Sequence, residues 1–190
     1  MFTDTWKKDY PEHAELASPP ANSSLAMLID LIGEGRRVLD VGCATGYLAK
    51  ALASRGCDVV GIDINADALT ESREFCSEAI AADLEVEPLG RILEGRARFD
   101  VAAFGDILEH LRNPLAVLES VRPLLAEGGF VVASIPNVAH AAVRLSLLGG
   151  RFDYQDFGLL DETHIRFFTR KSVEELFLVA GFRIEHMART

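Results

Sequence analysis

Short apolar runs alternate with helix-period segments over most of the chain. Five runs are apolar at nearly every position, and they lie at 37–41, 58–62, 78–81, 99–104 and 129–135. Such runs are typical of strands buried on both faces of a parallel sheet. The segments between them repeat apolar residues with a helical period, at 47–54, 66–75 and 114–125. Strand–helix–strand alternation predicts an open, doubly wound α/β fold with right-handed crossovers and helices on both faces.

The start of the chain is less regular. Residues 1–24 are largely polar and contain three prolines, so we expect a lead-in or a lid there. The remainder, 25–190, is expected to form one domain. A helix pattern covers 24–32 and should end at Gly33.

The pattern changes again after the fifth apolar run. A helical segment at 138–148 precedes a loop that is rich in aromatic and acidic residues. Thr169 is placed to cap a helix at 170–180. Beyond that helix, 182–187 alternates polar and apolar residues, which predicts a last strand.

Composition narrows the classes of partner. The chain has 190 residues, a formal net charge of −10, and 19 Lys and Arg against 29 Asp and Glu. A nucleic-acid or anionic membrane partner is therefore not expected, since both need clustered basic residues. No window approaches the roughly 20 apolar residues of a membrane helix, and the first residues lack a signal-peptide pattern, so we expect a cytoplasmic protein. Three scattered cysteines, without a Cys-x-x-Cys pair, predict reduced thiols and no metal site.

The most informative segment is the turn after the first predicted strand. It reads Asp-x-Gly-x-Ala-x-Gly, with Asp40, Gly42, Ala44 and Gly46 at its fixed positions and Cys43 between them. Small residues there let a ligand approach the backbone at a helix N-terminus. A carboxylate at Asp40 would repel phosphates but suits an ammonium group, which favours S-adenosylmethionine over NAD. The alternative is a tight turn that binds no ligand.

Two further acids end the next two predicted strands. Asp63 follows the glycine turn by about 20 residues, where a carboxylate can accept hydrogen bonds from both hydroxyls of a ribose. Asp83 could accept from an adenine amino group, with Ile64 and Leu84 against the faces of the ring. Capping of a helix is the alternative for Asp83. Ligands of open α/β sheets bind at this carboxyl edge, so three acids in succession favour binding.

Together with the segment 104–111, these residues resemble class I S-adenosylmethionine-dependent methyltransferases over about 25–135. The runs 134–148 and 158–169 are similar to the UbiG/MetW-like subgroup, especially to methyltransferase domains found beside bacterial glycosyltransferases. The resemblance implies a Rossmann-like, doubly wound, mostly parallel sheet of about six or seven strands. It implies methyl transfer to a small-molecule acceptor, with S-adenosylhomocysteine as product. An O-methyltransferase acting on a sugar or glycan precursor is the acceptor class to consider, with a glycosyltransferase domain as a partner.

The resemblance also implies roles for individual residues. Cofactor contacts are implied for Asp40, Gly42, Cys43, Ala44, Gly46, Asp63, Ile64, Asp83, Leu84, Phe104, Gly105, Asp106 and Ile107. Ala44 departs from the family, in which glycine is frequent, and its methyl group is tolerable if φ is negative. A second departure is the end of the chain, which leaves little room for the antiparallel seventh strand of the family.

Two histidines are candidates for catalysis. Methyl transfer from a sulfonium needs alignment and exclusion of water, and it needs a base only for an acceptor such as a hydroxyl. His110 follows the fourth predicted strand, and His164 lies in the segment 158–169. Either imidazole could take a proton near neutral pH, and the alternative is a hydrogen-bonded packing role. Asp106 could orient His110 instead of contacting the cofactor.

Two other functions remain open from the sequence. The chain could bind the cofactor without catalysis, as a regulatory partner of a glycosyltransferase or another biosynthetic enzyme. It could also be an NAD-dependent enzyme, although the glycine turn lacks the phosphate-loop pattern of that class.

Overall fold

A computed structural model describes residues 19, 20 and 22–189. The lid expected at 1–24 lies mostly outside the described residues. The first helix, α2, is Ser24–Ile32, and the Ser23 side chain caps it by accepting the backbone N–H of Ala26 at 3.2 Å. It ends at Gly33, as the sequence predicts.

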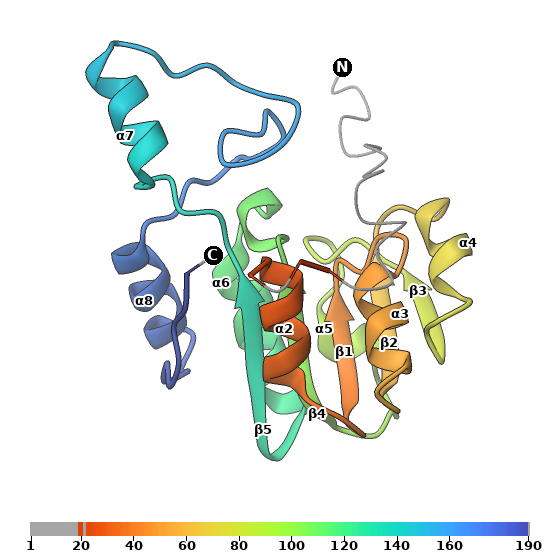
Figure 1. The fold of residues 1–190 in the computed structure, drawn as a ribbon. Helices are drawn as coiled ribbons and strands as arrows, with labels where there is room; N and C mark the ends of the chain where they lie inside the picture. The colour runs from red at the N-terminus through yellow and green to blue at the C-terminus, as the bar shows by residue number, and fades with distance from the viewer. Residues whose placement is uncertain (1–18, 21, 190) are drawn as a thin grey trace.

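The five apolar runs form one parallel sheet. Its strands are β1 (Arg37–Val41), β2 (Asp58–Asp63), β3 (Glu78–Ala81), β4 (Phe99–Gly105) and β5 (Leu125–Ser134). Their order is β3-β2-β1-β4-β5, and every neighbouring pair is parallel. Figure 1 shows the strand ends aligned along one edge. The doubly wound α/β fold is confirmed, because the order reverses direction beside β1.

Over the residues that the structure describes, the sheet has five strands, which is fewer than the six or seven expected. Residues 182–187 alternate in sequence but form no strand, and among the described residues β5 pairs with β4 alone. Alternation only makes one face of a segment apolar, whereas a strand also needs a neighbour for its backbone hydrogen bonds. The expected edge strand therefore does not form, because this segment has no neighbouring strand to which its backbone is hydrogen-bonded.

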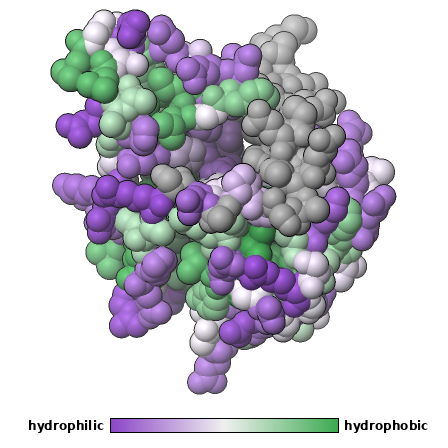
Figure 2. Space-filling view, in the orientation of Figure 1, coloured by the Kyte–Doolittle hydropathy of each residue, from purple (hydrophilic) through white to green (hydrophobic). Residues whose placement is uncertain are grey.

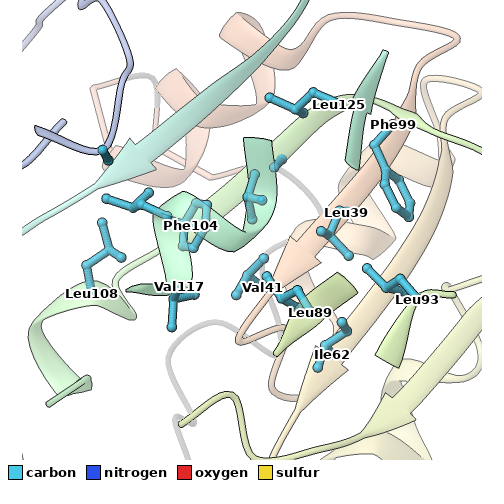
Figure 3. Packing of buried hydrophobic residues seen from close by; sticks show 14 of the residues in the cluster. Leu39, Val41, Ile62, Leu89, Leu93, Phe99, Phe104, Leu108, Val117 and Leu125 are labelled. Carbon is cyan, nitrogen blue, oxygen red and sulfur yellow. The ribbon is translucent and has the colours of Figure 1, made fainter. Parts of the chain in front are cut away.

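Helices cover both faces of the sheet (Figure 1). After α2 they are α3 (Tyr47–Ala53), α4 (Ala68–Ser72), α5 (Leu89–Ile92), α6 (Pro114–Val121), α7 (Ala141–Leu148) and α8 (Arg170–Val179). In β1, Val38 packs with α2 and α3, while Leu39 and Val41 pack with α5, α6 and α8. The second of these clusters is drawn in Figure 3, where Val41 lies close to Leu89. Burial on both faces explains why the strands are apolar throughout.

Several boundaries differ from the expected ones for local reasons. The helix expected at 114–125 ends at Val121 and continues as a 3₁₀ turn, Arg122–Leu124, since Pro123 has no N–H to donate. β5 starts four residues early because its pairing with β4 contains a bulge between Phe99 and Val101.

The last helix follows the prediction closely. Thr169 forms a capping box with Ser172, and α8 then runs to Val179. The helix α7 and the loop after it stand beyond the carboxyl ends of the strands (Figure 1). Figure 2 shows both apolar and polar side chains on this lobe. Within the part of the chain that the structure describes, no helix has the length and apolarity that a membrane crossing requires.

Candidate functional site

A wide cleft of about 2290 Å³ runs along the carboxyl edge of the sheet and continues along β5 to the segment after α8. It lies between the strand ends and the loops that approach them from α7 and α8. Eleven of the residues predicted as site residues line it, and these are Gly42, Ala44, Asp63, Ile64, Asp83, Leu84, Gly105, Asp106, Ile107, His110 and His164. The structure thus brings these predicted site residues, which are spread from Gly42 to His164 in the sequence, to one cavity.

Four predicted site residues do not line the cleft. Asp40, Cys43, Gly46 and Phe104 are buried beneath its floor. Phe104 belongs to the apolar cluster that supports β4 from below, as Figure 3 shows. These residues can shape the cleft, but their side chains do not face it.

The glycine turn is folded tightly against β2. The backbone N–H groups of Gly42 and Cys43 both donate to the carbonyl of Ile62, at 2.8 and 3.1 Å. Gly42 has a φ of 78°, and a Cβ built on it would lie 2.7 Å from Cγ1 of Ile107. Only glycine therefore fits here without movement of Ile107.

Gly46 has a different structural role. It has a φ of 83° and starts α3, and a Cβ there would lie 2.8 Å from Cα of Ser72 in α4. The absence of a side chain lets α4 approach α3 closely. This contact explains the glycine by packing, without a ligand.

Ala44 adopts a conformation that is unusual for alanine. Its φ is +46°, so the negative φ under which the extra methyl would be unstrained is not found. Its N–H donates to Oδ2 of Asp63 at 2.8 Å. This hydrogen bond holds the turn and the end of β2 together despite the backbone strain.

Asp63 keeps acceptor capacity for a ligand. Its second oxygen, Oδ1, accepts the backbone N–H of Asn65 at 2.8 Å. A carboxylate offers about four acceptor positions, so the two backbone bonds leave room for two hydroxyl donors. The position in the cleft and this capacity both fit a ribose diol.

Asp40 is a buried acid with an unsatisfied oxygen. It is 2% exposed, and its Oδ2 has no hydrogen-bond partner among the described residues. Burial, together with a smaller contribution from the negative charge of Asp63, raises the pKa of this carboxyl to about 7. Asp40 does not line the cleft, so its negative charge favours a cationic group there through its electrostatic potential and not through a direct contact.

The predicted adenine contacts also lie together in the cleft. Ile64 is 41% exposed there, beside Leu84 and Asp83. Oδ1 of Asp83 accepts the backbone N–H of Glu85 at 2.9 Å within a turn, whereas the N-cap of the next helix is Pro88, so Asp83 does not cap that helix. The second carboxylate oxygen can still accept from a ligand.

The tips of β4 and β5 are joined by Asp106. Its N–H donates to the carbonyl of Ser134, and its Oδ1 accepts the Ser134 hydroxyl at 2.6 Å. Asp106 has a φ of +54°, which is rare outside glycine. The turn places Gly105 and Ile107 in the cleft, on the side opposite Asp83.

The two candidate histidines lie side by side. The ring centroids of His110 and His164 are 4.9 Å apart, in an edge-to-face arrangement. Nδ1 of His110 is 3.3 Å from the carbonyl oxygen of Thr163. Backbone N–H groups of Ile165 and Arg166 donate to the carbonyl of Glu109, so the later loop is fixed against the end of β4.

Sequence reasoning did not assign a role to Glu109. It is 1% exposed, and neither carboxylate oxygen has a hydrogen-bond partner in the described structure. Oε1 lies 3.9 Å from Nε2 of His164. Burial raises the pKa of Glu109 well above its usual value, with a further contribution from Asp106. Its position next to His110 in the sequence was the signal that could have identified Glu109 as a site residue. The burial of its carboxylate cannot be read from the sequence.

Comparison with known proteins identifies the family of the chain. A family model described as a methyltransferase domain matches residues 14–187. A ubiquinone biosynthesis O-methyltransferase of Psychrobacter arcticus is 30% identical over 154 residues, which are 78% of this chain and 59% of that protein. A protein of the same name from Paracidovorax citrulli is 36% identical over 124 residues, covering 63% of this chain and 51% of the relative. The chain thus spans little more than half the length of these relatives.

Solved structures share the fold at lower identity. A SAM-dependent methyltransferase from Archaeoglobus fulgidus superposes with a TM-score of 0.62 and 20% identity, over 84% of this chain and 66% of that chain. The plantazolicin methyltransferase BamL was solved with a desmethylplantazolicin analogue and SAH. It superposes with a TM-score of 0.58 and 20% identity, over 76% of this chain and 53% of that chain. These likenesses concern the arrangement of the sheet and its helices.

Proposed function

Because this chain belongs to the methyltransferase domain family, we propose that it transfers a methyl group from S-adenosylmethionine to an oxygen atom of a small-molecule acceptor. The names of its curated relatives support oxygen as the acceptor atom. The proposal concerns the activity of a domain that covers part of those relatives.

One observation carries the proposal. Asp40, Asp63 and Asp83 lie at or just after the carboxyl ends of β1, β2 and β3, which are neighbours in the sheet. Asp63 and Asp83 line the cleft, and Asp40 lies below it, close enough for the charge of Asp63 to raise its pKa. Asp63 and Asp83 can pair with a ribose diol and an adenine amino group, and the buried charge of Asp40 favours a cation in the cleft above it.

The residues of the chain contribute mainly the alignment of cofactor and acceptor, whereas the reactive group belongs to the cofactor. S-adenosylmethionine, when bound, supplies an activated methyl group and a good leaving group. Gly42 lies close to Ile107, and Ile64 and Leu84 offer apolar side chains to the cleft, so these residues can position the cofactor. Such positioning lowers the barrier by fixing the reacting atoms in line.

A hydroxyl acceptor must lose its proton to a base when its oxygen is methylated. His110 and His164 line the cleft side by side, and we assign proton uptake to this pair. A hydroxyl of a sugar or glycan precursor is the acceptor that the sequence resemblance favours. A glycosyltransferase domain that supplies or consumes such a precursor is the corresponding partner.

Transfer of labelled methyl from S-adenosylmethionine to a panel of sugar and aromatic hydroxyl compounds tests the function. Labelled product with at least one hydroxyl acceptor is expected. The rival function is a cofactor-binding module. It would show tight SAH binding, no product with any acceptor, and stable co-purification with a biosynthetic enzyme.

A further inference from the structure

Two cysteines meet on one face of the sheet, at a position where β2 has no side chain. Cys43 lies in the glycine turn after β1, and Cys76 lies between α4 and β3. A Cβ built on Gly61 would lie 2.7 Å from Sγ of Cys43 and 3.1 Å from Sγ of Cys76. Both sulfurs therefore share the space that a side chain at position 61 would fill.

The pair explains why β2 contains a glycine. Gly61 lies in the interior of β2 and pairs with Asp40 of β1 and Ala79 of β3. Glycine weakens the interior of a strand, and it is found there where another group approaches the backbone closely. A side chain at this position would come between the two thiols, so its absence keeps Cys43 and Cys76 next to each other.

The two thiols differ in exposure and in acidity. Cys43 is 2% exposed, whereas Cys76 is only half-buried. The hydrogen bond between them raises the pKa of Cys43, as burial also does, and lowers the pKa of Cys76. Burial and the charge of Asp40 oppose this lowering at Cys76 but do not outweigh it. The thiolate, which is the reactive form of cysteine, therefore belongs to the more accessible partner.

The buried partner belongs to the turn that faces the cofactor cleft. Cys43 lies between Gly42 and Ala44, and both of these neighbours line the cleft. The N–H of Ala44 also donates to the carboxylate of Asp63 at 2.8 Å. A disulfide bond of about 2 Å is shorter than any contact between separate thiols, so its formation displaces the turn relative to β2.

We propose that Cys43 and Cys76 form a reversible disulfide under oxidation by a peroxide, and that this bond lowers the affinity of the cleft for the cofactor. The effect on the cofactor rests on the proposed function. The bond itself depends only on the position of the two sulfurs beside Gly61. The pair thus adds a redox-sensitive site to the glycine turn.

The chemistry balances with one molecule of hydrogen peroxide. The Cys76 thiolate attacks one oxygen and the O–O bond breaks, which leaves a sulfenic acid on Cys76. The hydroxide that departs takes up the proton that Cys76 has lost and becomes water. The Cys43 sulfur then attacks the Cys76 sulfur, the S–O bond breaks, and the second hydroxide leaves as water with the proton of Cys43. Two electrons have passed to the peroxide, and a dithiol returns them by thiol–disulfide exchange.

Treatment of the reduced, folded chain with hydrogen peroxide tests the pair directly. Mass spectrometry of peptides prepared without reduction should find a peptide that links Cys43 to Cys76. Calorimetric titration should show that oxidation weakens SAH binding by about 10-fold or more, the loss expected when a hydrogen bond to a charged group is broken. Dithiothreitol should restore the original affinity.

Two variants separate the pair from other effects of peroxide. Cys76→Ser should bind SAH like the reduced wild type, and peroxide should leave its affinity unchanged. Cys57→Ser is the matched control, because it removes the third cysteine, whose Sγ donates to the carbonyl of Gly33 at 3.8 Å. This variant should keep both the linked peptide and the loss of affinity.

Three results would count against these expectations in different ways. The absence of a peptide linking Cys43 to Cys76, or a link from Cys76 to Cys57 in its place, overturns the disulfide. A linked peptide with unchanged SAH affinity overturns the effect on the cofactor. Reduced, folded chain that does not bind SAH contradicts the proposed function, while the mass spectrum still decides whether the disulfide forms.

Discussion

The Asp63 carboxylate accepts the backbone N–H of Ala44 at 2.8 Å, and this bond ties the glycine turn after β1 to the end of β2. The same carboxylate is our candidate for the ribose of the cofactor. One side chain therefore organises the turn and faces the cleft. Its removal should affect both the turn and the ligand.

We expect Asp63→Ala to weaken SAH binding by roughly 10- to 100-fold. Hydrogen bonds to a charged group contribute about 1.5–3 kcal/mol, and the substitution also releases Ala44. Isothermal titration calorimetry measures the change. Glu87→Ala is the control, since it removes an exposed carboxylate that does not line the cleft. Equal affinities for the two variants would exclude the ribose assignment.

Gly42→Ala should reduce SAH affinity because the new methyl group collides with Ile107, 2.7 Å away. Gly56→Ala is a matched control. Gly56 has a similar φ of 72°, but nothing lies within 4 Å of the added Cβ. Both substitutions share a backbone strain of about 1–2 kcal/mol, and only the first should change the cofactor seat. Chemical denaturation and SAH titration separate the two effects.

Ala44→Gly should stabilise the chain by up to about 1 kcal/mol, since glycine adopts a φ of +46° without steric strain. The same substitution at Ala51, inside α3, should destabilise it by about 1 kcal/mol. Urea denaturation of both variants checks the opposite signs. Destabilisation of both would show that the turn does not strain Ala44.

The buried Asp40 predicts a pH dependence of stability. Its folded pKa of about 7 exceeds the ordinary 3.8, so the folded chain loses stability as the pH rises from about 4 to about 7. A shift of this size corresponds to about 4 kcal/mol. Asp40→Asn should therefore gain unfolding free energy relative to wild type at pH 8, and much less at pH 5.

Urea denaturation between pH 5 and pH 8 measures that difference. Asp67→Asn, at an exposed position, should show a small difference with little pH dependence. A constant difference between Asp40→Asn and wild type across this range would contradict the buried, perturbed carboxyl.

The sequence predicts the sheet well where burial is two-sided. Val38 and Leu39 pack on opposite faces, so the first strand is visible as an apolar run that Asp40 alone interrupts. The prediction fails at 182–187, because pairing depends on a neighbouring strand that a local pattern does not report. The short helix α5 was missed, since four residues show no complete helical period.

The site was predictable to the extent that its residues follow strand ends. Asp63 and Asp83 were found in this way, and both line the cleft. Glu109 was not found, because its buried and unpaired carboxylate depends on packing against a loop more than 50 residues later in the chain. Gly46 was assigned to the cofactor, yet its contact with Ser72 shows a packing role that spacing alone does not distinguish.

Calorimetric titration of the wild-type chain with SAH, and separately with NADH, tests the central claim most directly. The arrangement of Asp40, Asp63 and Asp83 predicts one SAH bound per chain and no measurable heat with NADH. Folded chain that binds NADH but not SAH, or neither compound, would contradict an adenosyl site built from these carboxylates.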